Sequence, residues 1–309
     1  MVEAGGIPVS DANASRTALG AALMRAVHTR RDQPRLIDDP WGDVLVSAEE
    51  KAAMCARIMA RAEPAARTRL AALGSEQAVL DIALRRHPSY AGVVVRSRCA
   101  EDALADAVAR GVRQYVLLGA GFDSFIVRQP TFASALTIFE VDHPVSQAMK
   151  RRRLAECDVA VPGNVRFVAA DLSVEPLADA LARGGFSAAV PAFFSWLGVT
   201  IYLTRAANDA TLAGIASAAA PGSELLFTYL DQRVFGSPHF EQMRVDRAAQ
   251  GEPWISGFDP ATLADDLRRL GLELVEDLDA AALTARYCAG RRDGLAPDGA
   301  SRIARARVT

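Results

Sequence analysis

Three polar clusters in the chain each follow a short apolar run, and their residue types suit the binding of a nucleoside. The clusters are Gly119-Ala120-Gly121, Asp142-His143 and Asp171-Leu172. A turn with two glycines lets the backbone approach a ligand closely and lead into a helix N-terminus. A carboxylate about 20 residues further on, as Asp142 is, accepts hydrogen bonds from ribose hydroxyls. The first two clusters therefore predict a nucleoside site.

The glycine turn favours S-adenosylmethionine over NAD. It lacks the third small residue of the dinucleotide fingerprint, and Asp123 puts a carboxylate where a pyrophosphate would approach. That charge repels a phosphate but is acceptable beside a zwitterionic amino acid and a sulfonium. Asp171 can accept a hydrogen bond from adenine N6, and the Leu172 amide can serve a ring nitrogen. Two plainer roles stay open: a purely structural glycine turn, and Asp171 as a helix N-cap.

These clusters need a sheet to bring them together. Five apolar runs, at 115–118, 136–141, 165–169, 191–202 and 223–230, are predicted strands. Helical patterns lie between and around them, at 98–110, 145–156, 176–183, 206–219 and 259–270. Further strands are expected at 272–276 and 302–308. Short, nearly continuous apolar strands that alternate with helices predict an α/β fold with a doubly wound, mostly parallel sheet. Ligands bind such a sheet at the carboxyl ends of its strands.

The composition narrows the class of protein and its partners. The chain has 309 residues, 50% of them hydrophobic, and a formal net charge of −2. That charge argues against a general nucleic-acid partner. The sequence shows neither a signal peptide nor a membrane-spanning run, so we expect a cytoplasmic protein. The four cysteines form no CxxC pair, and we expect no metal site and no disulfide.

With these motifs laid out, the chain resembles the leucine carboxyl methyltransferase-like proteins, in particular the actinobacterial (mycobacterial) branch of S-adenosylmethionine-dependent methyltransferases. The resemblance covers nearly the whole chain. Besides the three clusters it rests on Ser15-Arg16-Thr17-Ala18, Leu36-Ile37-Asp38-Asp39-Pro40, Arg96-Ser97-Arg98, Gly198-Val199-Thr200-Ile201-Tyr202-Leu203 and Gly290-Arg291-Arg292-Asp293-Gly294-Leu295.

The resemblance implies a class I methyltransferase (Rossmann-like) sheet with an antiparallel last strand. It also implies two parts: an N-terminal helical cover over residues 1–95 and an S-adenosylmethionine-binding domain over residues 96–309. Asp142 would hold the ribose, Asp171 and Leu172 the adenine, and Gly119, Ala120 and Gly121 would line the donor. Either Arg96 or Arg98 would pair with the methionine carboxylate, which needs a charge-assisted and preferably bidentate partner.

The acceptor side is less well defined. Candidate residues follow the fourth and fifth strands: Trp196, Tyr202, Tyr229 and Asp231. His143, next to the donor acid, is a further candidate for binding the cofactor, although a helix cap or a local hydrogen bond is its more expected role. The family commonly has Trp-Glu-Gly where this chain has Trp196-Leu197-Gly198. Cys99-Ala100-Glu101-Asp102 also departs from the aromatic and acidic residues usual after Arg98.

By family analogy, the expected reaction is O-methylation of a carboxyl or hydroxyl group on a small molecule. A carboxylate acceptor needs no general base, whereas an alcohol or phenol would need one; no catalytic base is assigned. Two alternatives stay open. One is a cofactor-binding protein without methyl transfer, suggested by Leu197, and the other is an NAD-dependent oxidoreductase, suggested by the glycine turn. The sequence does not predict the oligomeric state.

Overall fold

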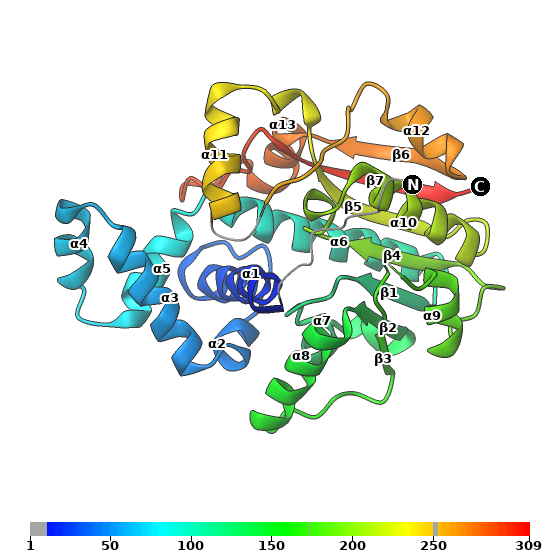
Figure 1. Cartoon of the computed structure of the whole chain (residues 1–309). Coiled ribbons are helices and arrows are strands. Elements are labelled where there is room, and N and C mark those ends of the chain that lie inside the picture. Colours follow the sequence, from blue (N-terminus) through cyan, green and yellow to red (C-terminus); the bar gives the residue numbers. More distant parts are fainter. Residues whose placement is uncertain (1–10, 173, 250–252) are drawn as a thin grey trace.

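The predicted strands assemble into one seven-stranded sheet in the order β3-β2-β1-β4-β5-β7-β6 (Figure 1). The computed structural model describes residues 11–172, 174–249 and 253–309. The strands are β1 (Gln114–Leu118), β2 (Thr137–Asp142), β3 (Val165–Ala169), β4 (Ala192–Trp196), β5 (Glu224–Leu230), β6 (Leu272–Leu278) and β7 (Ser301–Val308). Strands β1 to β5 pair in parallel, and β7 pairs antiparallel with both β5 and β6. The predicted doubly wound sheet with an antiparallel last strand is confirmed.

The central strands are apolar throughout because helices cover both faces of the sheet. Every residue of β1, β4 and β5 is buried. One core packs helices α6 (Tyr90–Ala109), α7 (Phe125–Arg128), α8 (Pro144–Glu156) and α13 (Ala280–Leu283) against one face. The other core packs α9 (Leu177–Arg183), α10 (Arg205–Ala218) and α12 (Leu263–Arg269) against the opposite face. Continuous apolar strands of this kind are typical of a parallel sheet buried on both sides.

The N-terminal part of the chain forms a group of helices that shares one hydrophobic core with α6, α8 and one face of the sheet. They are α1 (Asp11–Arg31), α2 (Trp41–Leu45), α3 (Ala48–Arg61), α4 (Pro64–Ala71) and α5 (Glu76–Arg85). Figure 1 looks along α1, which lies between the sheet and helices α3 to α5. α1 buries the stripe Leu19, Ala22, Leu23, Ala26 and Val27. α6 runs without a break across residues 95 and 96 and so joins these helices to the sheet.

The fourth strand is shorter than predicted. β4 ends at Trp196, and Thr200–Tyr202 form a 3-10 turn, η2. Gly198, with φ +70°, turns the chain between them, a conformation that side chains with a Cβ avoid. β6 continues two residues beyond its predicted end, and α12 begins four residues after its predicted start. The remaining elements are η1 (Thr131–Ala135), η3 (Gln232–Val234), α11 (Pro238–Ala249) and a π-turn, Thr284–Cys288.

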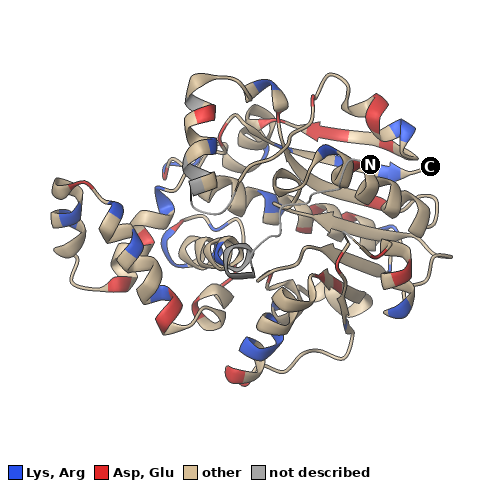
Figure 2. Cartoon of the chain, viewed as in Figure 1, with Lys and Arg blue, Asp and Glu red and all other residues tan. Residues whose placement is uncertain are grey.

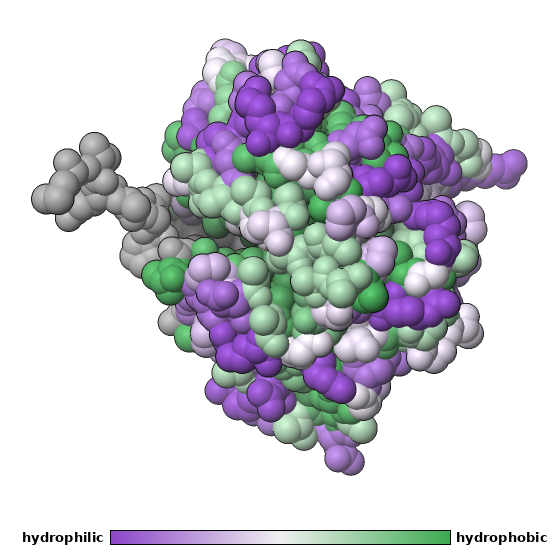
Figure 3. Space-filling model, turned by 90° about the vertical axis from the view of Figure 1, so that its right-hand side faces the viewer, coloured by the Kyte–Doolittle hydropathy of each residue, from purple (hydrophilic) through white to green (hydrophobic). Residues whose placement is uncertain are grey.

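Charge is spread over the surface. Figure 2 shows basic and acidic segments distributed over the outer helices, whereas β1 and β4 carry no charged residue. On the face drawn in Figure 3, hydrophobic residues are interspersed with hydrophilic ones. Within the described ranges, no helix combines the length and the apolar character needed to cross a membrane.

Candidate functional site

The glycine turn lies where the strand order reverses, between β1 and β4. Gly119 has φ +65° and donates its N–H to the carbonyl of Val141 at 2.9 Å. A Cβ at Gly119 would come within 2.6 Å of Val199, which follows β4. A Cβ at Gly121, with φ +49°, would lie 3.0 Å from Ala18 of α1. Both glycines are therefore required by a close approach as well as by φ.

The acids predicted to hold a nucleoside lie next to this turn. The Asp142 carboxylate accepts hydrogen bonds from the N–H of Gly121 at 2.6 Å and of His143 at 2.8 Å. Burial raises the pKa of Asp142, although these two N–H groups oppose that effect. At the end of β3, Asp171 Oδ2 lies 3.9 Å from His143 Nε2. The carboxyl ends of β1, β2 and β3 thus bring Gly121, Asp142, His143 and Asp171 together.

The structure shows whether His143 and Asp171 have the structural roles considered for them, a local hydrogen bond and a helix N-cap. His143 is the N-cap of α8, and its Nδ1 accepts from the Val145 N–H at 3.4 Å, so the expected local hydrogen bond is confirmed. Asp171 does not cap α9, because the N-cap of that helix is Pro176, five residues later. The Asp171 side chain is half-buried at the strand end, and Leu172 packs partly against the second core.

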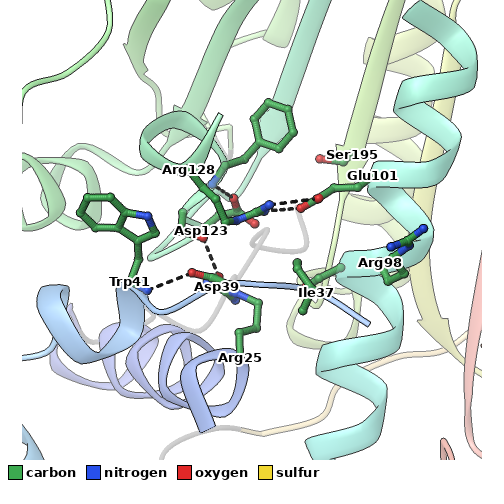
Figure 4. Close-up of polar contacts among 12 residues, drawn as sticks. Arg25, Ile37, Asp39, Trp41, Arg98, Glu101, Asp123, Arg128 and Ser195 are labelled. Carbon is green, nitrogen blue, oxygen red and sulfur yellow. Dashed lines mark hydrogen bonds and ion pairs between the residues drawn. The ribbon is translucent and has the colours of Figure 1, made fainter. Parts of the chain in front are cut away.

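The two candidate arginines point to different places. Arg96 lines a cavity and lies against Gly198, where a Cβ would come within 2.7 Å of both terminal guanidinium nitrogens. Desolvation lowers the pKa of Arg96 to about 10. Among the described residues, no carboxylate lies within 4.0 Å of its guanidinium. Arg98 instead pairs with Asp102 at 2.8 Å and donates to the Leu36 carbonyl. Figure 4 shows Arg98 turned away from the cluster around Asp123.

A cavity of about 670 Å³ lies between the helical cover and the sheet. Its walls include Gly20 and Met24 of α1, Arg96 of α6, and Gly198 and Tyr202 after β4. The N–H of Gly198 donates to Thr228 Oγ1 at 2.7 Å, which holds this turn against β5. Because Gly198 precedes Val199, which faces Gly119, the cavity adjoins the glycine turn. The geometry therefore places a nucleoside-type site next to a partly open cavity large enough for a small molecule.

Of the four acceptor-side candidates, Tyr202 and Tyr229 line the cavity, and Trp196 and Asp231 do not. Trp196 is 2% exposed and packs beside Phe227 in the second core. Tyr229 borders the cavity, but its hydroxyl donates to Asp277 at 2.9 Å. Asp231 caps η3 and pairs with Arg233 at 2.6 Å. The sequence could not separate these cases, because an apolar strand buried on both faces does not reveal which side chains face a ligand.

A buried ion pair ties the helical cover to the glycine turn, and the sequence pattern did not reveal it. Arg25 Nε of α1 lies 2.6 Å from Asp39, and the Arg25 guanidinium also donates to the Phe122 carbonyl at 2.9 Å. The Ser124 hydroxyl donates to the same carboxylate at 2.6 Å. Burial alone would raise the pKa of Asp39, but Arg25, Ser124 and Arg128 together hold it below its ordinary value. Figure 4 shows Asp39 between these groups and the backbone of Trp41.

A second buried pair supports the turn from the other side. Lys150 of α8 pairs with Glu140 of β2, and its ammonium donates to the Asp123 carbonyl at 2.6 Å. Burial raises the pKa of Glu140 to about 7 against the opposing effect of Lys150. Across the turn, Arg128 pairs with Glu101 of α6 (Figure 4). Charged side chains therefore fix the glycine turn to α1, α6 and α8.

The sheet topology, the glycine turn and the strand-end acids together define the class of protein. A sheet with one antiparallel strand, a glycine turn after β1, and acids after β2 and β3 is the arrangement of class I S-adenosylmethionine-dependent methyltransferases. Among the described residues, no cluster of His, Cys, Asp and Glu could hold a metal ion.

Comparison with known proteins identifies the family. The family model for leucine carboxyl methyltransferase matches residues 18–216. A Bacillus subtilis protein named "Putative S-adenosyl-L-methionine-dependent methyltransferase YktD" is 31% identical over 290 residues, which cover 91% of this chain and 93% of that protein. A Mycolicibacterium smegmatis protein with the same type of name is 34% identical over 218 residues, 71% of this chain and 67% of the relative. The chain belongs to the leucine carboxyl methyltransferase family.

Solved structures agree on the fold. A Thermobifida fusca protein, titled a "putative methyltransferase", aligns with a TM-score of 0.52 at 20% identity, over 76% of this chain and 88% of that one. A Streptomyces avermitilis protein of the duf574 family aligns with a TM-score of 0.51 at 20% identity, over 70% of this chain and 84% of that one. At this identity the likeness concerns the fold alone.

Proposed function

We propose that this methyltransferase transfers a methyl group from S-adenosylmethionine to a carboxyl or hydroxyl oxygen of a small molecule. The observation that carries the proposal is that the strand-end site lies next to the cavity. Val199 lies so near Gly119 that a Cβ there would come within 2.6 Å of it, and Gly198, which precedes Val199, lines the cavity together with Arg96 and Tyr202. A donor held at the strand ends would therefore face an acceptor held under the helical cover.

The residues present fit the donor. Gly119 and Gly121 give the backbone the positive φ of a tight turn at the strand end, and the Asp142 carboxylate retains lone pairs for ribose hydroxyls beyond the two N–H groups it already accepts. Asp171 and the Leu172 amide would serve the adenine. Arg96, which has no carboxylate partner among the described residues, would pair with the methionine carboxylate. S-adenosylmethionine supplies the electrophilic methyl carbon when it is bound.

The role of the protein is then mainly alignment and exclusion of water. The Arg25–Asp39 pair and α1 hold the cover over the turn, and the turn at Gly198 is fixed by Thr228. A carboxylate acceptor attacks without a base, whereas a hydroxyl must lose its proton. Tyr202, His87 and Asp298 all line the cavity, and their side chains could exchange a proton with an acceptor.

The donor site is tested first by calorimetry with S-adenosylmethionine, S-adenosylhomocysteine and NADH. Asp142→Ala is expected to abolish binding of the first two ligands, whereas Asp265→Asn, on the exposed surface of α12, should bind like the wild type. Binding of NADH alone would contradict the proposal.

The acceptor atom is tested with labelled methyl donor and a panel of carboxylic acids, phenols and amines. A methyl ester releases methanol in alkali and an ether does not, and mass spectrometry separates both from an N-methyl product. Carboxyl or hydroxyl methylation is expected. A panel in which only amines are methylated would overturn the assignment to oxygen.

A further inference from the structure

One face of α3 is turned into the cavity. Met54, Arg57, Ile58 and Arg61 all line it. Their spacing of three, four and seven residues places them on a single helical stripe. The stripe thus presents two apolar side chains and two guanidinium groups to the same space.

In the part of the chain that the structure describes, Arg57 and Arg61 have no acidic partner. Among the described residues, no carboxylate oxygen lies within 4.0 Å of either guanidinium. Arg30 and Arg31 of the N-terminal helices pair with Asp81, and Arg85 pairs with Asp32. Arg67, Arg69 and Arg86 also have no carboxylate within 4.0 Å among the described residues, but they do not line the cavity. Like charges four residues apart on a helix repel each other. Arg57 is half-buried and Arg61 is exposed, so an anion bound between these two side chains would remove a weak repulsion and add two charge-assisted contacts.

The cavity as a whole is cationic in a chain whose net charge is −2. The described residues that line it include five arginines (Arg16, Arg57, Arg61, Arg96 and Arg302) and one carboxylate, Asp298. The Asp298 carboxylate already accepts from the N–H groups of Ala300 and Ser301. Arg302 is paired with Asp277. The charge left uncompensated is concentrated on α3 and at Arg96.

The rest of the lining is largely apolar. It includes Met24, Met54, Ile58, Leu84, Ile201 and Trp254. A methionine-rich wall adapts to ligands of different shape. An occupant that satisfies the whole cavity must therefore combine an apolar body with a negative group.

We infer that the acceptor is an anionic amphiphile whose negative group, a carboxylate, sulfonate or phosphate, pairs with Arg57 and Arg61, apart from the atom that is methylated. In the view of Figure 1, α3 and the strands lie on opposite sides of α1. The methylated atom must lie on the strand side, near Gly198 and Arg96, whereas the negative group lies on the α3 side. This inference rests on the proposed function in taking the cavity as the acceptor site.

The test uses two fluorescent probes that differ by one charged group. 8-Anilino-1-naphthalenesulfonate carries a sulfonate, and N-phenyl-1-naphthylamine has the same rings without it. Because a charge-assisted pair with two arginines stabilises only the sulfonate, we expect it to bind at least about tenfold more tightly. Its affinity should also fall with added salt. Failure of both probes to bind, or equal affinity for both, would overturn the inference.

Variants locate the charge preference. Arg57→Gln with Arg61→Gln is expected to remove the preference for the sulfonate and to leave binding of the neutral probe within about twofold. Arg57→Lys with Arg61→Lys should keep most of the preference for the sulfonate. The control Arg69→Gln, on the exposed surface of α4 outside the cavity, should leave that preference unchanged. An equal loss for both probes would mean that the arginines act only by packing, which contradicts the inference.

The two proposals fail separately. S-adenosylhomocysteine titrated into the same variants reports on the donor site, which the α3 substitutions should leave unchanged. If S-adenosylhomocysteine binds neither to the wild type nor to the variants, but the sulfonate probe still binds more tightly than the neutral one, the proposed reaction fails and the anion site stands. If the ligand binds normally and the probes do not discriminate, only the anion site fails.

Discussion

The guanidinium of Arg96 occupies the space where Gly198 would carry a side chain: a Cβ there would come within 2.7 Å of both terminal nitrogens. The contact joins α6 to the turn after β4. Since Gly198 also has φ +70°, two independent constraints select glycine at this position. The position of the cation is therefore set by the absence of one side chain.

Gly198→Ala should separate these two constraints when it is compared with Gly74→Ala. Gly74 has φ +71°, but a Cβ there would meet nothing within 4 Å. Both variants are expected to lower the free energy of unfolding by about 1–2 kcal/mol through the left-handed backbone. Only Gly198→Ala should also displace Arg96 and weaken S-adenosylhomocysteine binding, by about tenfold or more. Denaturant titration and calorimetry measure the two effects, and equal affinities in the two variants would contradict a role for the contact.

Lysine substitutions at the two candidate arginines should give opposite results. Arg96→Lys keeps the charge but loses the planar pair of donors that a carboxylate prefers. We expect S-adenosylhomocysteine to bind about 10–100-fold more weakly, since hydrogen bonds to charged groups contribute about 1.5–3 kcal/mol. Arg98→Lys changes an exposed pair with Asp102 and should leave the affinity unchanged. If Arg98→Lys is the variant that loses affinity, the assignment of the carboxylate to Arg96 is wrong.

The strands and their polar ends could be predicted because they depend on local signals. Continuous apolar runs indicate strands buried on both faces, and Gly119, Gly121, Asp142 and Asp171 follow such runs directly. The direction of Trp196 and Tyr229 could not be predicted, because alternation disappears when both faces are buried. The Arg25–Asp39–Ser124 network could not be predicted from the sequence either, because Asp39 and Ser124 lie 85 residues apart and come together only in the folded chain.

Breaking the Arg25–Asp39 pair should destabilise the fold and the glycine turn together. Arg25→Met leaves a buried carboxylate without its cation, and loss of one partner from a buried pair costs about 3–5 kcal/mol. Arg35→Met provides the matched control, because Arg35 pairs with Asp38 at 3.7 Å on the surface and exposed pairs contribute about 0–1 kcal/mol. Urea titration compares the variants, and hydrogen exchange of the 119–124 amides reports on the turn. Equal stability of the two variants would contradict the role of the buried pair.

The stabilising effect of Asp39 should depend on pH with a definite sign. Because its pKa is held below the ordinary value, its contribution to stability is present at neutral pH and is lost as the pH falls through that lowered pKa. Asp39→Asn should therefore reduce stability strongly at pH 7 and progressively less in acid. Thermal unfolding of both proteins across the acid range measures this difference. A difference that stays constant with pH would show that packing rather than charge accounts for the effect.

The contribution of Asp142 to the stability of the free protein should depend on pH with the opposite sign to that of Asp39. Asp142 should also make the binding of the methyl donor weaker in acid. Burial raises its pKa above 3.8, so the free protein loses stability as the pH rises through the raised value and the buried carboxyl ionises. Ribose hydroxyls favour the ionised form, so S-adenosylhomocysteine binding should release protons near that pKa and weaken below it. Calorimetry in two buffers with different ionisation enthalpies counts the protons released. Glu140 lies close by, and burial raises its pKa to about 7, so the same profile in Asp142→Asn would assign the effect to Glu140 instead.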